Sequence, residues 1–228
     1  MPYVFPLPPV TALPVVGQES QFPVRRVYCV GRNYADHARE MGSDPNREPP
    51  FFFSKPADAI VPGGGELPIP SLTRNYHYEV EMVVAIGKGG SDIPVAEALE
   101  HVFGYAVGLD MTRRDLQLAM KEQGKPWEIG KGADLSAPVS AVNPAERIGH
   151  PHSGPIRLSL NGELKQNGDL SNMSLSVAEV IANLSLFFTL APGDLIFTGT
   201  PAGVGKVAAG DEVLAEVAGV GALRVKFR

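Results

Sequence analysis

Residues 77–84 read HYEVEMVV, and this alternation of polar and apolar residues predicts a β-strand. Glu79 and Glu81 fall on one face of that strand, and the apolar residues between them point into the core. Two carboxylates side by side repel each other and resist burial unless a positive charge neutralises them. A divalent cation meets that need. The alternative is a strand with one solvated face, and this segment alone favours neither interpretation.

A third carboxylate follows a second apolar run. Residues 102–110 read VFGYAVGLD, which also predicts a strand, with Asp110 at its end. Three carboxylates from two strands would form a site with oxygen ligands only. Such a site suits magnesium or manganese, calcium less well, and zinc least. The alternative for Asp110 is a turn or N-cap residue for a helix that starts near Thr112.

The whole chain is typical of a globular protein. Its 228 residues suffice for one large domain, and no apolar stretch is long enough to span a membrane. The N-terminus lacks the basic region and continuous apolar core of a signal peptide, so we expect a cytoplasmic protein. The single cysteine, Cys29, is expected to be a small core residue. A net charge of -5 argues against nucleic acid as a partner.

Turn-forming residues divide the chain into many short segments. The 25 glycines and 21 prolines predict an α+β fold that is mainly β, with few helices. An Asn161-Gly162 pair favours a hairpin turn. The predicted strands cover residues 26–31, 51–54, 77–86, 102–110, 156–161, 194–198, 211–217 and 221–227.

The clearest helix is predicted over 177–189, where Ser176 and Glu179 form a capping-box pattern ahead of an apolar face. Three further helices are predicted over residues 33–41, 94–101 and 113–124. Residues 1–24 are interpreted as a proline-rich N-terminal arm that leads into one catalytic domain over 25–228.

The segment 33–41 also carries candidate catalytic residues. Its helical spacing places His37 and Glu40 on one face, so that the carboxylate can orient the imidazole as a general base. General-base catalysis is typically worth about 10²- to 10⁴-fold in rate. The alternative is an ordinary surface contact on an exposed helix. The glycine-rich stretch that follows, up to residues 62–65, is interpreted as loop that would let the segment move as a lid.

A cationic group follows the third carboxylate. Arg113 and Arg114 come soon after Asp110, and a guanidinium can hold a substrate carboxylate by two hydrogen bonds. Arginines in a first helical turn oppose the helix dipole, which weakens the alternative of plain surface charge. Lys131 lies between two glycines and can approach a reacting oxygen closely. Thr200, in a glycine turn after a predicted strand, offers its hydroxyl to an anion.

Taken together, in this order, the motifs resemble the fumarylacetoacetate hydrolase superfamily, and within it the fumarylpyruvate hydrolases and acylpyruvases. The resemblance covers about residues 26–228 and implies a mixed β-roll or sandwich fold, commonly dimeric. The motifs are Gly31-Arg32-Asn33-Tyr34 with His37 and Glu40, Phe53-Ser54-Lys55-Pro56, Glu79-Val80-Glu81, Gly108-Leu109-Asp110-Met111-Thr112 with Arg114, Asp115 and Gln117, Lys131, and Gly199-Thr200-Pro201.

The resemblance further implies Mg2+ or Mn2+ bound by Glu79, Glu81 and Asp110, and a lid that carries His37 and Glu40. The implied reaction is hydrolysis of a carbon–carbon bond in a 2,4-dioxo acid. In it the metal chelates the 1-carboxylate and the 2-oxo oxygen, the dyad activates a water, and Lys131 stabilises the oxyanion. The expected substrate-binding residues are Arg32, Lys55, Arg113, Arg114, Gln117 and Thr200.

Three functions stay open from the sequence. We prefer hydrolysis of fumarylpyruvate to fumarate and pyruvate in aromatic degradation, with Arg113 expected to bind the distal carboxylate. The alternative is an acylpyruvase with oxaloacetate decarboxylase, tautomerase or isomerase activity on 2-oxo acids, because the fold and the metal do not fix the reaction. A metal-binding β-module without activity is disfavoured, since ligands, dyad and lysine are all present.

Overall fold

A large mixed β-sheet forms the centre of the molecule. The computed structural model describes residues 3–42 and 51–228. The sheet runs in the order β4-β3-β15-β8-β9-β11-β5, with β12 beside β9. Its strands are β3 (Arg26–Gly31), β4 (Phe51–Lys55), β5 (Ile60–Pro62), β8 (Val80–Ile86), β9 (Val102–Leu109), β11 (Ala137–Val139), β12 (Asn143–Pro144) and β15 (Asp194–Phe197).

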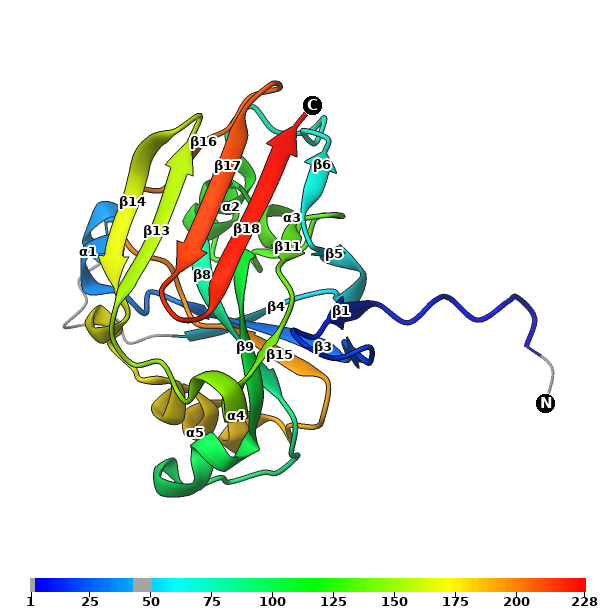
Figure 1. Ribbon diagram of the computed structural model, residues 1–228. Helices are drawn as coiled ribbons and strands as arrows, with labels where there is room; N and C mark the ends of the chain where they lie inside the picture. Colours follow the sequence, from blue (N-terminus) through cyan, green and yellow to red (C-terminus); the bar gives the residue numbers. More distant parts are fainter. Residues whose placement is uncertain (1–2, 43–50) are drawn as a thin grey trace.

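A five-stranded sheet in the order β14-β13-β17-β18-β6 forms a second layer, and Figure 1 shows its strands side by side. Asn161 and Gly162 connect β13 to β14 with φ of 53° and 82°, which confirms the predicted hairpin turn. The strands are β6 (Gly65–Leu67), β13 (Pro155–Leu160), β14 (Glu163–Asp169), β17 (Glu212–Val217) and β18 (Gly221–Phe227). Two smaller sheets contain β7 (Tyr76–Tyr78), β10 (Thr112–Arg113) and β16 (Gly205–Lys206), and β1 (Ala12–Pro14) and β2 (Gln21–Pro23).

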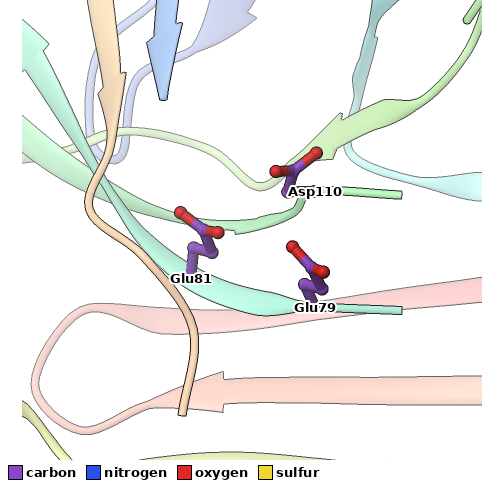
Figure 2. Close-up of side chains that lie close together, drawn as sticks. All are labelled: Glu79, Glu81 and Asp110. Atoms are coloured by element: carbon purple, nitrogen blue, oxygen red, sulfur yellow. The ribbon is translucent and has the colours of Figure 1, made fainter. Parts of the chain in front are cut away.

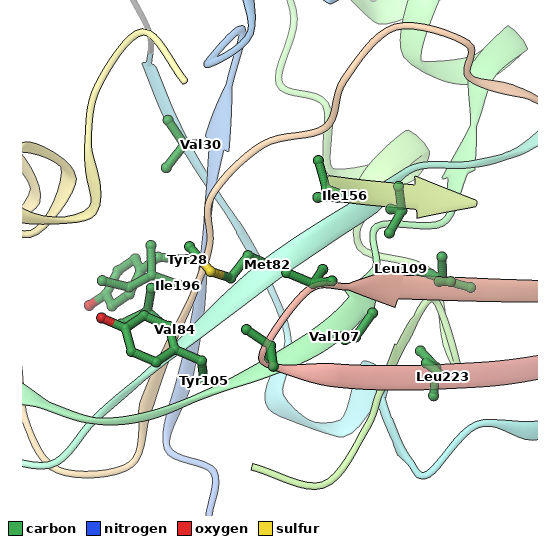
Figure 3. Packing of buried hydrophobic residues seen from close by; sticks show 14 of the residues in the cluster. Tyr28, Val30, Met82, Val84, Tyr105, Val107, Leu109, Ile156, Ile196 and Leu223 are labelled. Atoms are coloured by element: carbon green, nitrogen blue, oxygen red, sulfur yellow. The ribbon is translucent and has the colours of Figure 1, made fainter. Parts of the chain in front are cut away.

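Strand β8 is buried on both faces. Val80, Met82 and Val84 point into the larger core cluster, where they meet side chains of β9, β13 and β18 (Figure 3). Val83 and Ala85, on the opposite face, belong to a second cluster with β3 and β15. All five side chains are fully buried, as the sequence predicts for the first three. Because burying a side chain of this size contributes about 1.5–3 kcal/mol, β8 is firmly held in place.

The predicted strand over 77–86 is divided at Glu79. Strand β7 pairs with β10 and β16, whereas β8 pairs with β9 and β15. The backbone of Glu79 lies between them, and its carbonyl accepts a hydrogen bond from the Asp110 N–H at 2.9 Å. The chain therefore passes from the three-stranded sheet into the large sheet, and its side chains keep alternating between the two faces. The two predicted ligand strands meet where the sheets adjoin.

The helices are few and short, which confirms a mainly β fold. Helix α5 carries the predicted capping box: the Ser176 hydroxyl accepts from the Glu179 N–H, and the Glu179 carboxylate accepts from the Ser176 N–H. The helices are α1 (Ala35–Glu40), α2 (Arg114–Glu122), α3 (Glu128–Lys131), α4 (Ala145–Ile148) and α5 (Val177–Phe187), with 3-10 helices η1 (Ala57–Ala59), η2 (Val95–His101) and η3 (Leu170–Asn172).

One helix prediction was wrong in type. The segment predicted as helix over 94–101 is the 3-10 helix η2, which follows the extended Pro94 and runs directly into β9. A short connection of this kind favours the tighter i to i+3 hydrogen bonding. Among residues 3–42 and 51–228, no helix combines the length and apolar character that a membrane crossing needs.

The segment predicted as an arm contains two different parts. Residues 3–10 are exposed and extend away from the body (dark blue in Figure 1). Leu13 and Phe22, on β1 and β2, are instead buried in the second core cluster. Part of the predicted lid, residues 43–50, lies outside the described residues. Gly63 and Gly64 form the turn between β5 and β6, Gly65 begins β6, and all three have positive φ.

Candidate active site

Three buried carboxylates form the centre of the site. Glu79, Glu81 and Asp110 each offer an oxygen, and these oxygens all lie within 4.8 Å of one another. Figure 2 shows the three side chains close together, at the start of β8 and just after the end of β9. The register that pairs Glu81 with Gly108 brings Asp110 beside Glu79. The structure thus brings together the three residues that the sequence predicts as metal ligands.

Two of the carboxylates have cationic partners. The Lys131 ammonium donates to Glu79 Oε2 at 2.6 Å and to Asp110 Oδ2 at 2.7 Å. The Arg114 guanidinium donates to Glu79 Oε1, and the Lys55 ammonium lies 2.9 Å from Asp110 Oδ1. Burial alone would raise the pKa of Glu79, but the charges of Lys131 and Arg114 hold that pKa below its ordinary value.

Glu81 has no such partner among the described side chains. Its Oε2 accepts one hydrogen bond, from the Gly199 N–H at 2.7 Å. Burial raises the pKa of Glu81 well above its ordinary value, and the charges of Asp110 and Glu79 raise it further. A buried carboxylate with a single neutral donor is costly in its charged form. A divalent cation would remove that cost, and a donor set of carboxylate oxygens fits a hard cation such as Mg2+ or Mn2+.

The predicted dyad is formed on α1. His37 Nδ1 lies 3.2 Å from Glu40 Oε2, and His37 lines the same cavity as the three carboxylates. Glu40 is also held by the Gly203 N–H, at 3.2 Å from Oε1. The hydrogen bond from His37 is the main cause that lowers the pKa of Glu40. A charged Glu40 accepts the Nδ1 hydrogen, so that Nε2 is left as the basic nitrogen.

One face of α2 forms a wall of the cavity. Arg114, Gln117, Leu118 and Lys121 follow the i, i+3, i+4, i+7 spacing of a single helix face. Arg114 donates to Gln117 Oε1 at 2.5 Å, which fixes the guanidinium beside the carboxylates. The remaining walls include Val30, Gly31, Arg32, Met41, Phe53, Trp127 and Thr200.

Two expected substrate-binding residues lie off this cavity. Lys55 is fully buried, and its ammonium donates to the carbonyls of Met111 and Lys131 rather than facing the cavity. Arg113 follows Thr112 in β10, and successive strand residues point to opposite sides. Because the Thr112 hydroxyl accepts from Lys131, Arg113 points away from the site. Neither placement supports a contact with the substrate.

The sequence interpretation missed His77. It lies on the same face as Glu79, two residues earlier, but its partners are Arg114 and Asn75. Burial, then the charge of Arg114, lowers the pKa of His77 to about 4. The neutral ring donates from Nε2 to Asn75 and presents Nδ1 to the guanidinium at 3.5 Å. His77 therefore supports Arg114 rather than joining the carboxylates.

Several known proteins are similar to this chain in sequence, and one solved structure is similar in fold. The chain is 56% identical to the fumarylpyruvate hydrolase of Pseudomonas aeruginosa, solved in complex with Mn2+ and pyruvate, with a TM-score of 0.97 and 99% of each chain covered. It is 43% identical to the fumarylpyruvate hydrolase of a Ralstonia species, over 78% of this chain and 92% of that protein. It is also 46% identical to the mitochondrial oxaloacetate tautomerase FAHD1 of Mus musculus, over 90% and 92%.

A family comparison agrees with these relatives. Residues 26–228 match the family described as fumarylacetoacetate (FAA) hydrolase C-terminal, which covers the predicted catalytic domain almost completely. The resemblance inferred from the motifs is thereby confirmed, as is the mainly β fold class. The chain belongs to the fumarylacetoacetate hydrolase family.

Proposed function

We propose that this protein hydrolyses a carbon–carbon bond in fumarylpyruvate and releases fumarate and pyruvate. The observation that carries the proposal is one cavity lined by three buried carboxylates, Lys131 and His37, in a chain so similar to a hydrolase of this substrate. The test is turnover of fumarylpyruvate, acetylpyruvate and oxaloacetate by the purified protein with Mn2+ or Mg2+. Aromatic degradation in the cytoplasm is the setting that this reaction suits.

The cofactor in this proposal is Mn2+ or Mg2+, held by Glu79, Glu81 and Asp110. When bound, the cation would supply positive charge and Lewis acidity to the 2-oxo acid end of the substrate. Arg114 and Thr200 line the cavity beside these carboxylates and offer hydrogen-bond donors to the same anionic end. Gln117 keeps the Arg114 guanidinium in place through their hydrogen bond.

The chain's own groups carry the proton transfers. His37, oriented by Glu40, accepts a proton at Nε2 from the attacking water. It then returns this proton to the carbon of the departing pyruvate at which the bond was broken. The Lys131 ammonium is buried on the cavity wall, and its three N–H groups donate to Glu79, Asp110 and Thr112. It would therefore act on the negative charge that develops on the 4-carbonyl oxygen through its positive charge. Phe53 and Trp127 form an apolar wall that limits water around the reacting atoms.

The distal carboxylate of fumarylpyruvate needs a cation away from the three carboxylates. Lys121 lines the cavity on the same face of α2 as Arg114, about 10 Å farther along the helix axis at 1.5 Å per residue. Its ammonium is half-buried and donates to the Met41 carbonyl at 3.3 Å. Lys121 is therefore placed at the end of the cavity opposite Arg114, where the distal carboxylate would lie.

The Lys121→Met variant should lose activity on fumarylpyruvate selectively. Acetylpyruvate lacks the distal carboxylate, so the missing ion pair affects only the longer substrate. A hydrogen bond to a charged group contributes about 1.5–3 kcal/mol, which corresponds to a decrease of about ten- to a hundredfold in kcat/KM. The measurement is steady-state kinetics on both substrates at saturating Mn2+.

Lys125→Met is the matched control for this experiment. Lys125 is exposed just beyond the end of α2, and its ammonium bonds only to Gln123 among the described residues, so the substitution removes a charge without touching the cavity. Both substrates should be turned over by this variant as by the parent. Equal losses on both substrates in Lys121→Met would assign Lys121 to holding α1 through Met41 and not to substrate choice.

A second candidate function is tautomerisation of oxaloacetate. The specific observation in its favour is the 46% identity to a mammalian oxaloacetate tautomerase. Oxaloacetate also carries two carboxylates, so the same cations can bind it at both ends. A tautomerase moves protons without breaking a carbon–carbon bond, so release of two acids from a dioxo acid distinguishes the hydrolase.

We also propose a homodimer. Leu186 and Phe187, at the end of α5, are 63% and 70% exposed, and the ring of Phe187 lies 6.3 Å from that of Phe52 between centroids, tilted by 58°. An exposed group of large apolar side chains is typical of a protein interface. Light scattering should give twice the chain mass of 24.3 kDa, and Phe187→Asp should shift the protein to the monomer mass. A monomer at all concentrations for the parent would contradict this proposal.

A further inference from the structure

Gln166 is a polar side chain in an unusual position. It lies on β14, the edge strand of the five-stranded sheet, yet it is fully buried. The next residue on each side, Lys165 and Asn167, is at least partly exposed. A buried amide is costly unless its hydrogen-bonding groups are satisfied. The partners of this amide therefore indicate why it is there.

Its hydrogen bonds reach two parts of the active site. Gln166 Oε1 accepts from the Val80 N–H at 3.0 Å, and Val80 lies between the carboxylates of Glu79 and Glu81. Gln166 Nε2 donates to Thr200 Oγ1 and to the Pro201 carbonyl, both at 2.8 Å. One side chain on a distant strand thus connects the ligand strand β8 to the loop over 199–203.

The chemistry of the partners fixes the orientation of the amide. A backbone N–H can only donate, so the Gln166 atom that faces Val80 must be the oxygen. The NH2 group then faces Thr200, and the Thr200 oxygen accepts. Because that oxygen already accepts from Gln166, the hydroxyl hydrogen of Thr200 is left to point into the cavity that Thr200 lines. In this orientation Thr200 is a donor suited to an anion.

The same loop contacts the other functional groups. The Gly199 N–H donates to Glu81, and the Gly203 N–H donates to Glu40 of the dyad. Gly203 packs so closely on β14 that an added Cβ would lie 2.2 Å from the Lys165 carbonyl oxygen. Strand β14 therefore holds the loop at Gly203 by close packing and at its centre by Gln166.

We propose that Gln166 is a positioning residue that fixes the Thr200 hydroxyl as a hydrogen-bond donor to the carboxylate end of the substrate. This inference rests on the proposed function only for the identity of the substrate. It assigns Gln166 no contact with the reacting atoms. Any effect of Gln166 on substrate binding must therefore depend on Thr200, and this dependence is the property to measure.

A double-mutant cycle between Gln166→Met and Thr200→Val tests this directly. The readout is the affinity of the Mn2+-loaded protein for oxalate, a small dianion related to the pyruvate enolate, measured by calorimetry. Each single variant should bind oxalate about tenfold more weakly, because each removes or misdirects a donor to a charged ligand. The double variant should be no more than about twofold weaker than the weaker single variant, because coupled residues are not additive. Affinity for Mn2+ alone should stay within about threefold of the parent.

Two further variants separate positioning from stability. Gln166→Asn shortens the side chain by a methylene group, so that its amide can no longer reach both Val80 and Thr200, and oxalate should again bind about tenfold more weakly. This variant also serves if Gln166→Met does not fold. Ser185→Ala removes a buried hydroxyl that bonds Ile93 on the far side of the core. It should lower the melting temperature and leave oxalate affinity unchanged.

The proposal would be overturned if the losses of oxalate affinity in the two single variants multiply in the double variant. It would also be overturned if both Gln166 variants bind oxalate as tightly as the parent. The same cycle repeated on kcat/KM for fumarylpyruvate should give the same coupling. A parent protein that does not hydrolyse fumarylpyruvate would count against the proposed function alone. The oxalate cycle would still decide the role of Gln166.

Discussion

Replacing Glu81 by Ala should abolish Mn2+ binding and turnover while the protein stays folded. Glu81 is one of three ligand carboxylates, and it alone has no cationic side chain among its described partners. Its removal therefore leaves no buried cation uncompensated, and it deletes a carboxylate whose charged form is disfavoured by burial. Calorimetry with Mn2+ measures the first effect, and thermal unfolding in the presence of a chelator measures the second.

The Glu79→Ala variant provides the contrast for this prediction. Glu79 accepts from both Lys131 and Arg114, so its removal leaves the buried Arg114 without its carboxylate partner and leaves Lys131 with Asp110 alone. Breaking a buried ion pair in this way typically costs about 3–5 kcal/mol of stability. Both variants should lose the metal, but only Glu79→Ala should unfold at a markedly lower temperature. Mn2+ affinity equal to the parent in Glu81→Ala would show that the ligand assignment is wrong.

The His37→Ala variant should lower kcat on fumarylpyruvate by about 10²- to 10⁴-fold, the typical contribution of a positioned general base. His37 does not belong to the carboxylate cluster, so Mn2+ and oxalate should bind as in the parent. Single-turnover kinetics on the Mn2+-loaded protein measures the chemical step, and calorimetry measures the two affinities. This pattern separates water activation from binding of metal or substrate.

Glu40→Gln is the companion variant. The amide can still contact His37 and the Gly203 N–H, but it lacks the charge that stabilises the imidazolium. Activity should fall less than in His37→Ala, and the double variant should resemble His37→Ala alone, since the carboxylate acts through the ring. Undiminished hydrolysis in His37→Ala would remove the dyad from the mechanism.

The sequence predicted the centre of the site because strand geometry has a period of two. Alternation in residues 77–84 placed Glu79 and Glu81 on one face, and an apolar run ending at Asp110 supplied the third carboxylate. The division of the strand at Glu79 was missed because both halves keep the same alternation in different sheets. Register between strands depends on tertiary pairing, which a single segment does not encode.

Side-chain direction explains why two of the expected substrate-binding cations do not line the cavity. Spacing along the chain put Arg113 near Asp110, but the two-residue strand β10 points Thr112 toward the site and Arg113 away from it. Lys55 lies close to Asp110, yet it is fully buried and not on the cavity wall. For Arg113, proximity in sequence gave the correct neighbourhood, but the fold decided the side of the strand to which the side chain points.

Strand β14 was missed for a different reason. Its sequence, ELKQNGD, is polar because it pairs on one side only and leaves every residue except Gln166 at least partly exposed. Gln166 is the exception within it, and nothing in the local sequence distinguishes its buried position from that of a surface glutamine. A residue that acts by positioning another residue is therefore the hardest kind to predict from a single sequence.

Product analysis of one reaction tests the proposed function most directly. Purified protein would be incubated with fumarylpyruvate, with and without Mn2+, and the acids released would be quantified. We expect fumarate and pyruvate in equal amounts, with Mn2+ and not with a chelator. No release of either acid, alongside Mn2+-dependent tautomerisation of oxaloacetate by the same preparation, would contradict the hydrolase and establish the second candidate function in its place.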